Sequence, residues 1–275
     1  MRNDRSDLPM PHPLSPMPLY TERTPGAESA PTLVLAHAFG GSSRTWRGTV
    51  EALGGSMPTV AVDLCGWGAS APPDRGADEA PGGFSVADMA DSLARVASDL
   101  GLTRWALVGH SMSGKAAVAL AARRPAGLLA LVLVAPSPPT PEPMTDANRA
   151  RLRAAWGDRA EAERIVRSVV VRPLAPEVFE TAVEDHLRAS HAAWTAWLDA
   201  GSREDVSALA AQVAVPTLVV AGSDDAALGE DVQRATTLRL VPGARLETVR
   251  RAGHFVPLDA PADLAALLRA HVLRS

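Results

Sequence analysis

The residues from Gly109 to Gly114 carry the clearest chemical signal in this sequence. They read Gly-His-Ser-Met-Ser-Gly and directly follow the apolar run 105–108. A serine between small residues, placed between a short buried strand and a helix, is typical of the sharp turn that raises a nucleophilic hydroxyl above a sheet edge. The helical pattern over 115–123 supplies the second half of that context. Ser111 is therefore the candidate nucleophile.

Two later segments supply a candidate base and a candidate acid. The apolar run 216–221 leads to Asp224 and Asp225, and the alternating run 245–249 leads to His254. A serine hydroxyl is a poor nucleophile until a base removes its proton, and a carboxylate holds such a base in the correct tautomer. We expect His254 to be the base. Adjacent aspartates point in different directions, so one of the two is the acid.

Two backbone N–H groups are expected to stabilise the negative charge that develops on a substrate oxygen. Met112 begins the helix after the serine, so its N–H points toward the group under attack. The apolar run 32–36 leads to the loop 37–41, in which the N–H of Phe39 is the second candidate donor. Loss of one such donor costs roughly 3 kcal/mol of transition-state stabilisation in comparable sites.

Apolar runs that alternate with helical patterns must position these groups. Continuous Val/Leu runs separated by amphipathic helices indicate a parallel sheet covered on both faces. The predicted fold class is therefore α/β, with a mostly parallel central sheet. The expected strands are 32–36, 59–62, 105–108, 129–134, 216–221 and 245–249, and the clearest helices are 86–99, 115–123 and 261–273.

One interval between expected strands is too long for a single crossover helix. It opens with the Pro-rich stretch 135–143 and continues with several helical patterns, which predicts a helical cap over 137–205. Its aromatic residues are candidates for lining a substrate pocket, although packing against the core is the commoner role of buried aromatics. These candidates are Trp156, Phe179, Trp194 and Trp197.

The motifs together resemble those of α/β-hydrolase-fold proteins, from about Leu33 to the end of the chain. The serine, acid and histidine occur in the order typical of that fold. Ser113 departs from the resemblance, since it replaces a glycine of the family's elbow. The matching segments are 37–40 (H-G-x-G), 63–70 (D-x-x-G-x-G-x-S), 109–114 (G-H-S-M-G-G), 222–225 (G-x-x-D) and 253–261 (G-H-x-x-x-x-acid-x-P).

The resemblance implies that Asp225, not Asp224, is the acid, and that the cap follows the sixth strand. It also implies a serine hydrolase of the carboxylesterase or thioesterase type, which cleaves an ester, thioester or lactone through an acyl-enzyme. A serine at the elbow argues against epoxide hydrolases and haloalkane dehalogenases, which use a carboxylate there. C–C bond hydrolysis, perhydrolysis or a lyase step on the same residues stays open, as does a ligand receptor with slow turnover.

Composition sets the remaining expectations. The 275 residues allow one large domain, with a core over 26–136 and 206–275 and a flexible leader over 1–25. The net charge of −4 and the single Cys65 predict neither nucleic-acid nor membrane partners, no metal and no cofactor. The expected partner is a small-molecule acyl substrate of a cytoplasmic protein, and the oligomeric state is left open.

Overall fold

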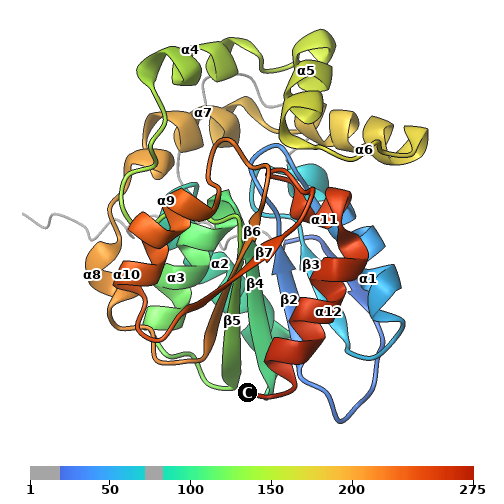
Figure 1. Ribbon diagram of the computed structural model, residues 1–275, viewed down its shortest axis with the longest axis vertical. Coiled ribbons are helices and arrows are strands. Elements are labelled where there is room, and N and C mark those ends of the chain that lie inside the picture. The colour runs from blue at the N-terminus through green and yellow to red at the C-terminus, as the bar shows by residue number, and fades with distance from the viewer. Residues whose placement is uncertain (1–18, 72–82) are drawn as a thin grey trace, which may run out of the picture.

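A seven-stranded sheet forms the centre of the part of the chain that the computed structural model describes, residues 19–71 and 83–275 (Figure 1). The strand order is β1-β3-β2-β4-β5-β6-β7, and every neighbouring pair is parallel except β1 with β3. The strands are β1 (Thr21–Thr24), β2 (Thr32–Ala36), β3 (Thr59–Val62), β4 (Trp105–His110), β5 (Leu128–Val134), β6 (Thr217–Gly222) and β7 (Arg245–Val249). The predicted mostly parallel sheet is confirmed.

Both faces of the sheet are buried, which explains why its central strands read as unbroken apolar runs. Successive residues of one strand enter different hydrophobic clusters. Val34 and Leu107 belong to one cluster, whereas Leu33, Leu35 and Val108 belong to the other. This alternation follows from the two-residue period of a strand. A strand covered on both sides needs apolar residues at every position.

Helices on each face supply the other half of each cluster (Figure 1). The helices α2, α3, α8 and α10 contribute to or pack against one cluster, and α1 and α12 pack on the opposite face. The core helices are α1 (Arg47–Leu53), α2 (Val86–Asp99), α3 (Met112–Ala122), α8 (Ser207–Ala210), α9 (Glu230–Ala235), α10 (Thr237–Leu240), α11 (Val256–Asp259) and α12 (Pro261–Val272).

The strand β1 corrects the expectation of a flexible leader over 1–25. Its polar residues pair antiparallel with β3, with Thr21 opposite Val62 and Thr24 opposite Thr59. An edge strand of this kind is stabilised by backbone hydrogen bonds more than by burial of side chains, so its sequence lacks an apolar run. The rest of that expectation, residues 1–18, lies outside the described residues.

Four of the helices between β5 and β6 lie over the carboxyl ends of the strands (Figure 1). We call them the cap helices: α4 (Asp146–Ala154), α5 (Arg159–Val169), α6 (Pro176–Leu187) and α7 (His191–Asp199). Side chains of Thr145, Asp158 and Ser190 accept backbone N–H groups and begin three of them. The cap helices follow the fifth described strand and not the sixth. The resemblance implied the family's strand count, whereas the described residues form five strands before the cap.

A buried lysine of α3 joins the two ends of the cap segment. The Nζ of Lys115 donates to the carbonyl oxygens of Thr140 (3.1 Å), Ser202 (3.4 Å) and Glu204 (2.8 Å). Burial lowers the pKa of Lys115 to about 8, so its ammonium still carries three protons at neutral pH. Three donors therefore meet three acceptors where the chain enters and leaves the cap.

Replacement of Lys115 by methionine is expected to destabilise the protein by about 2 kcal/mol, because carbonyl groups lose their donor inside the protein. Urea unfolding measures the loss, and limited proteolysis is expected to cut first near 139–142 and 202–204. The matched control is Arg104→Met, which removes a cation from the carbonyl of Ser29 at the surface. Equal stability of the two variants would contradict the assigned role of Lys115.

Candidate active site

The candidate nucleophile lies in a strained turn between β4 and α3. Ser111 has φ 52° and ψ −115°, a backbone conformation that residues other than glycine rarely adopt. A Cβ on Gly109 would lie 2.7 Å from the carbonyl oxygen of Ser113, and one on Gly114 would lie 2.6 Å from Cβ of Pro136. These close approaches explain the small residues on both sides of the serine.

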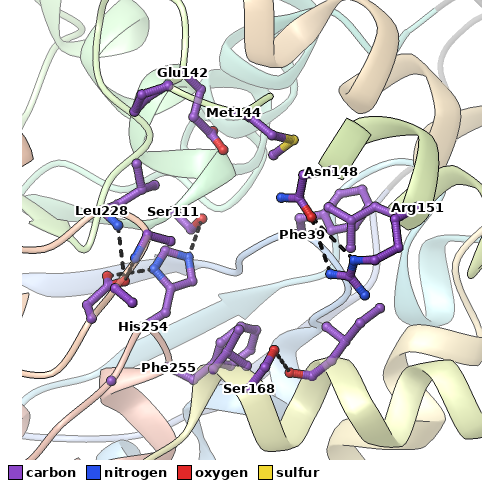
Figure 2. A pocket seen from close by; sticks show the side chains of 18 of the residues that line it. Phe39, Ser111, Glu142, Met144, Asn148, Arg151, Ser168, Leu228, His254 and Phe255 are labelled. Atoms are coloured by element: carbon purple, nitrogen blue, oxygen red, sulfur yellow. Dashed lines mark hydrogen bonds and ion pairs between the residues drawn. The ribbon is translucent and has the colours of Figure 1, made fainter. Parts of the chain in front are cut away.

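The structure brings Ser111, His254 and Asp225 into one hydrogen-bonded chain (Figure 2). Nε2 of His254 lies 2.8 Å from Oγ of Ser111, and Nδ1 lies 2.8 Å from Oδ2 of Asp225. When Nδ1–H donates to the aspartate, Nε2 is free to accept the serine proton. The three residues come from the carboxyl-end loops of β4, β6 and β7, which lie with β5 in one half of the sheet.

The structure places Asp225, and not Asp224, against the histidine. The second carboxylate oxygen of Asp225 accepts the backbone N–H groups of Ala227 (2.9 Å) and Leu228 (3.0 Å), which fixes its orientation. The Asp224 carboxylate instead accepts a hydrogen bond from the hydroxyl of Ser223 at 2.6 Å. Asp224 also lines the cavity, but it has no hydrogen bond to His254 and bonds locally within its turn.

Charge coupling sets the protonation of the histidine and its aspartate. Burial is the largest influence on His254 and lowers its pKa, but the charge and hydrogen bond of Asp225, together with the charge of Glu142, outweigh burial, so the pKa is raised. Burial likewise acts to raise the pKa of Asp225, and His254 with the two backbone donors reverses the direction, so this pKa is lowered. The pair therefore favours a charged aspartate beside an imidazole that readily takes a proton.

A second histidine and a second carboxylate hold the His254 loop in place. Nε2–H of His110 donates to the carbonyl oxygen of His254 at 2.9 Å, and burial lowers the pKa of His110 to about 3. His110 is thus a neutral donor at working pH. The carboxylate of Asp259 accepts the N–H groups of Gly253 (2.7 Å) and Val171 (2.9 Å), which joins this loop to the end of α5.

The two backbone N–H groups expected to bind an oxyanion are available in the structure. Neither the N–H of Phe39 nor that of Met112 donates to a described residue. The Phe39 loop is positioned by His37, whose Nδ1–H donates to the Ala38 carbonyl at 2.8 Å and whose Nε2 accepts the Leu64 N–H at 3.1 Å. Burial lowers the pKa of His37, which maintains this neutral tautomer.

A cavity of about 520 Å³ opens beside Ser111 and His254, beneath the cap helices (Figure 2). Of the four aromatic residues expected to line it, Trp197 does so. The indole N–H of Trp156 donates to the Ala189 carbonyl at the surface, and Phe179 packs against the Arg167 guanidinium. Trp194 is buried behind Phe39, at 4.2 Å between ring centroids. These three therefore have packing roles, and their assignment to the pocket is corrected.

The cap contributes other residues to the cavity that the sequence analysis missed. Asn148, Arg151 and Leu152 share one face of α4, and the preceding segment adds Glu142 and Met144. Their spacing of i, i+3 and i+4 is the signal that would have placed the three on one helix face. In Figure 2, Asn148 and Arg151 lie on the side of the cavity away from Ser111.

Comparisons with known proteins identify the family to which this protein belongs. Residues 33–267 match the sequence profile of the Alpha/beta hydrolase family. The chain therefore belongs to the α/β hydrolase family, and the predicted family resemblance is confirmed. Among the described residues, no helix has the length and apolar character needed to cross a membrane.

Relatives of this chain carry names from several hydrolase activities. It is 31% identical to the "Putative carbamate hydrolase RutD" of Klebsiella pneumoniae (strain 342), over 82% of this chain and 85% of the relative. A thermophilic esterase from Thermogutta terrifontis is 25% identical, with TM-score 0.76 and coverage of 93% of each chain. The enol-lactonase from Burkholderia xenovorans LB400 shares the fold, with 21% identity, TM-score 0.78 and coverage of 93% and 96%.

Proposed function

We propose that this α/β hydrolase is a serine hydrolase that cleaves a carboxylic ester, thioester or lactone without a cofactor. The observation that carries the proposal is the continuous chain of hydrogen bonds from Asp225 through His254 to Ser111, which ends at the cavity. An arrangement of nucleophile, base and orienting acid within about 3 Å of one another is that of a catalytic triad.

In the proposed reaction, Ser111 attacks the substrate carbonyl while His254 accepts the hydroxyl proton. The N–H groups of Phe39 and Met112 bind the oxygen that becomes negatively charged. His254 then gives its proton to the leaving group, which departs as an alcohol or thiol and leaves an acyl-enzyme on Ser111. A water molecule, activated by the same histidine, releases the acid and restores the serine.

A carbamate is the second candidate substrate, because the curated relative with 31% identity is named a carbamate hydrolase. Esters and carbamates present the same carbonyl group to the serine and differ in the atom beside it. We further propose that the cap helices and the segment before α4 form the substrate-binding wall, since Met144, Asn148 and Leu152 line the cavity. The mixture of apolar and polar groups suits a small to medium acyl group.

Turnover of p-nitrophenyl esters from acetyl to decanoyl tests the proposal. We expect hydrolysis that peaks at one chain length, which would also size the acyl pocket. Labelling of Ser111 by a fluorophosphonate without ester turnover would favour the C–C bond hydrolase, perhydrolase or lyase alternatives. Neither turnover nor labelling would favour a ligand receptor and contradict the proposal.

The pH dependence of kcat/KM is expected to show a rising limb with its midpoint above pH 6.5. Only neutral His254 accepts the serine proton, and Asp225 raises the pKa of this imidazole above its ordinary value of 6.5. Activity should therefore be lost as the pH falls through the raised pKa. The profile of a p-nitrophenyl ester measures this midpoint, and a value well below 6.5 would contradict the electrostatic role of Asp225.

A further inference from the structure

One carboxylate in the cavity has no role in the proposed triad. Glu142 lies in the segment that enters the cap and lines the same cavity as Ser111 and His254. In Figure 2 its carboxyl group points into the cavity on the side of those two residues. Its charge also acts to raise the pKa of His254, as expected of a carboxylate close to the imidazole. Glu142 is therefore near the reacting atoms without belonging to the triad.

The backbone of Glu142 is fixed, whereas its side chain lacks a donor. Its N–H donates to the Ser202 carbonyl at 2.8 Å, and its carbonyl oxygen accepts the N–H of Met144 at 2.7 Å. Its Oε2, by contrast, is covered and accepts no hydrogen bond from the described residues. A buried acceptor without a donor costs free energy, and rotation about the last side-chain bond can turn either oxygen toward the cavity.

The charge of Glu142, unlike its hydrogen-bonding capacity, is already balanced. Two buried cations, Lys115 and Arg149, feel its negative charge, but neither donates a hydrogen bond to its carboxylate; Arg149 reaches only the backbone carbonyl of Glu142, at 3.4 Å. Lys115 donates to three carbonyl groups, and Arg149 donates to the Leu198 carbonyl and to the hydroxyl of Ser202. The carboxylate thus has compensating charge nearby but no donor, so a neutral N–H group suits it better than a further cation.

We propose that Glu142 determines specificity by accepting a hydrogen bond from a neutral N–H group of the substrate, beside the carbonyl that Ser111 attacks. This inference rests on the proposed function and narrows its substrate class to acyl compounds with such an N–H, of which N-alkyl carbamates are the simplest. A CH₂ group in place of N–H leaves the carboxylate unpaired, and a site of this kind discriminates against the analogue that lacks the donor.

The test compares two p-nitrophenyl substrates of equal length. The N-propylcarbamate has an N–H beside the carbonyl, and the pentanoate has a CH₂ at the same place. In the first turnover of either, a bond forms between Oγ of Ser111 and the carbonyl carbon, the serine proton passes to His254, and p-nitrophenolate leaves. Stopped-flow absorbance gives the acylation rate constant for each, after subtraction of spontaneous release.

Glu142→Leu is expected to lower the acylation constant of the carbamate by about tenfold more than that of the pentanoate, the effect of one hydrogen bond to a charged acceptor. Glu142→Gln keeps a carbonyl acceptor and should lose less. Comparing each substrate between variant and parent cancels the intrinsic reactivity of the two substrates. The N-methyl-N-propylcarbamate, which has no N–H, should respond to the substitution as the pentanoate does.

The matched control is Glu204→Gln, which removes another carboxylate beside Lys115 but lies outside the cavity. Its ratio of carbamate to pentanoate acylation should equal that of the parent protein. A lower melting temperature of Glu142→Leu with an unchanged ratio would show that Glu142 only balances charge, and would overturn the inference. If the pentanoate acylates Ser111 but Glu142→Leu leaves the ratio of carbamate to pentanoate acylation unchanged, this inference fails and the proposed function stands. If neither substrate acylates Ser111, the proposed function fails.

Discussion

Ser111→Ala is expected to lower kcat for p-nitrophenyl esters by about a millionfold, the effect of removing the nucleophile of a triad that acts as a unit. Binding of the ester should change little, because the alanine removes one hydroxyl from a cavity lined largely by cap residues. The strained turn should persist as well, since it is imposed by the close packing of Gly109 and Gly114. Steady-state turnover and labelling by a fluorophosphonate probe measure the loss.

A nearby serine provides the control. The hydroxyl of Ser113 donates to the Ala36 carbonyl at 2.8 Å and accepts the His110 N–H at 2.9 Å. It is therefore engaged in buried hydrogen bonds and is not available to attack a substrate. Ser113→Ala should retain probe labelling even if its stability falls. Full activity of Ser111→Ala, or labelling that is lost only in Ser113→Ala, would remove Ser111 from the mechanism.

Asp225→Asn is expected to lower kcat by roughly 10⁴-fold, as loss of the orienting carboxylate does in a related constellation. The amide presents a donor or a neutral acceptor to Nδ1, so the imidazole loses its preference for the tautomer with a free Nε2. The charge that raises the pKa of His254 is lost at the same time. The midpoint of the residual pH profile should therefore move to lower pH.

Asp224→Asn is the matched control, since it makes the same chemical change one residue away. Its carboxylate is bonded to Ser223, so we expect kcat within about threefold of the parent, as for most surface substitutions. The two variants are compared through kcat/KM between pH 5 and 9. A larger loss in Asp224→Asn, or an unshifted midpoint in Asp225→Asn, would contradict the proposed acid.

The core and the hydrogen-bonded arrangement of the candidate triad were predictable because each depends on local sequence. The elbow needs small residues at fixed positions around Ser111, and buried parallel strands need unbroken apolar runs. In contrast, β1 has neither signal, because its polar residues are held by backbone pairing with β3. Edge strands of this kind can be recognised only when the partner strand is in place.

The cavity wall was harder to predict, because large aromatic residues suit both pockets and cores. Trp194 has the residue type of a substrate contact, yet its indole N–H donates to the Leu152 carbonyl and its ring packs behind Phe39. The role of Lys115 also depends on distant segments, since its three acceptors lie 25 to 89 residues away along the chain. Neither arrangement leaves a local pattern in the sequence.

The bonds of Asp259 have a consequence for how the cap and the base can move. One carboxylate holds the N–H of Gly253, next to His254, and those of Val171 and Arg172 at the end of α5. Lifting the cap at this edge would remove Val171 and Arg172 from the carboxylate that also holds the loop of the histidine. This edge of the cap is therefore suited to be preorganised. The wall of the cavity is then already formed before substrate binds, so binding does not bear the free-energy cost of ordering the cap.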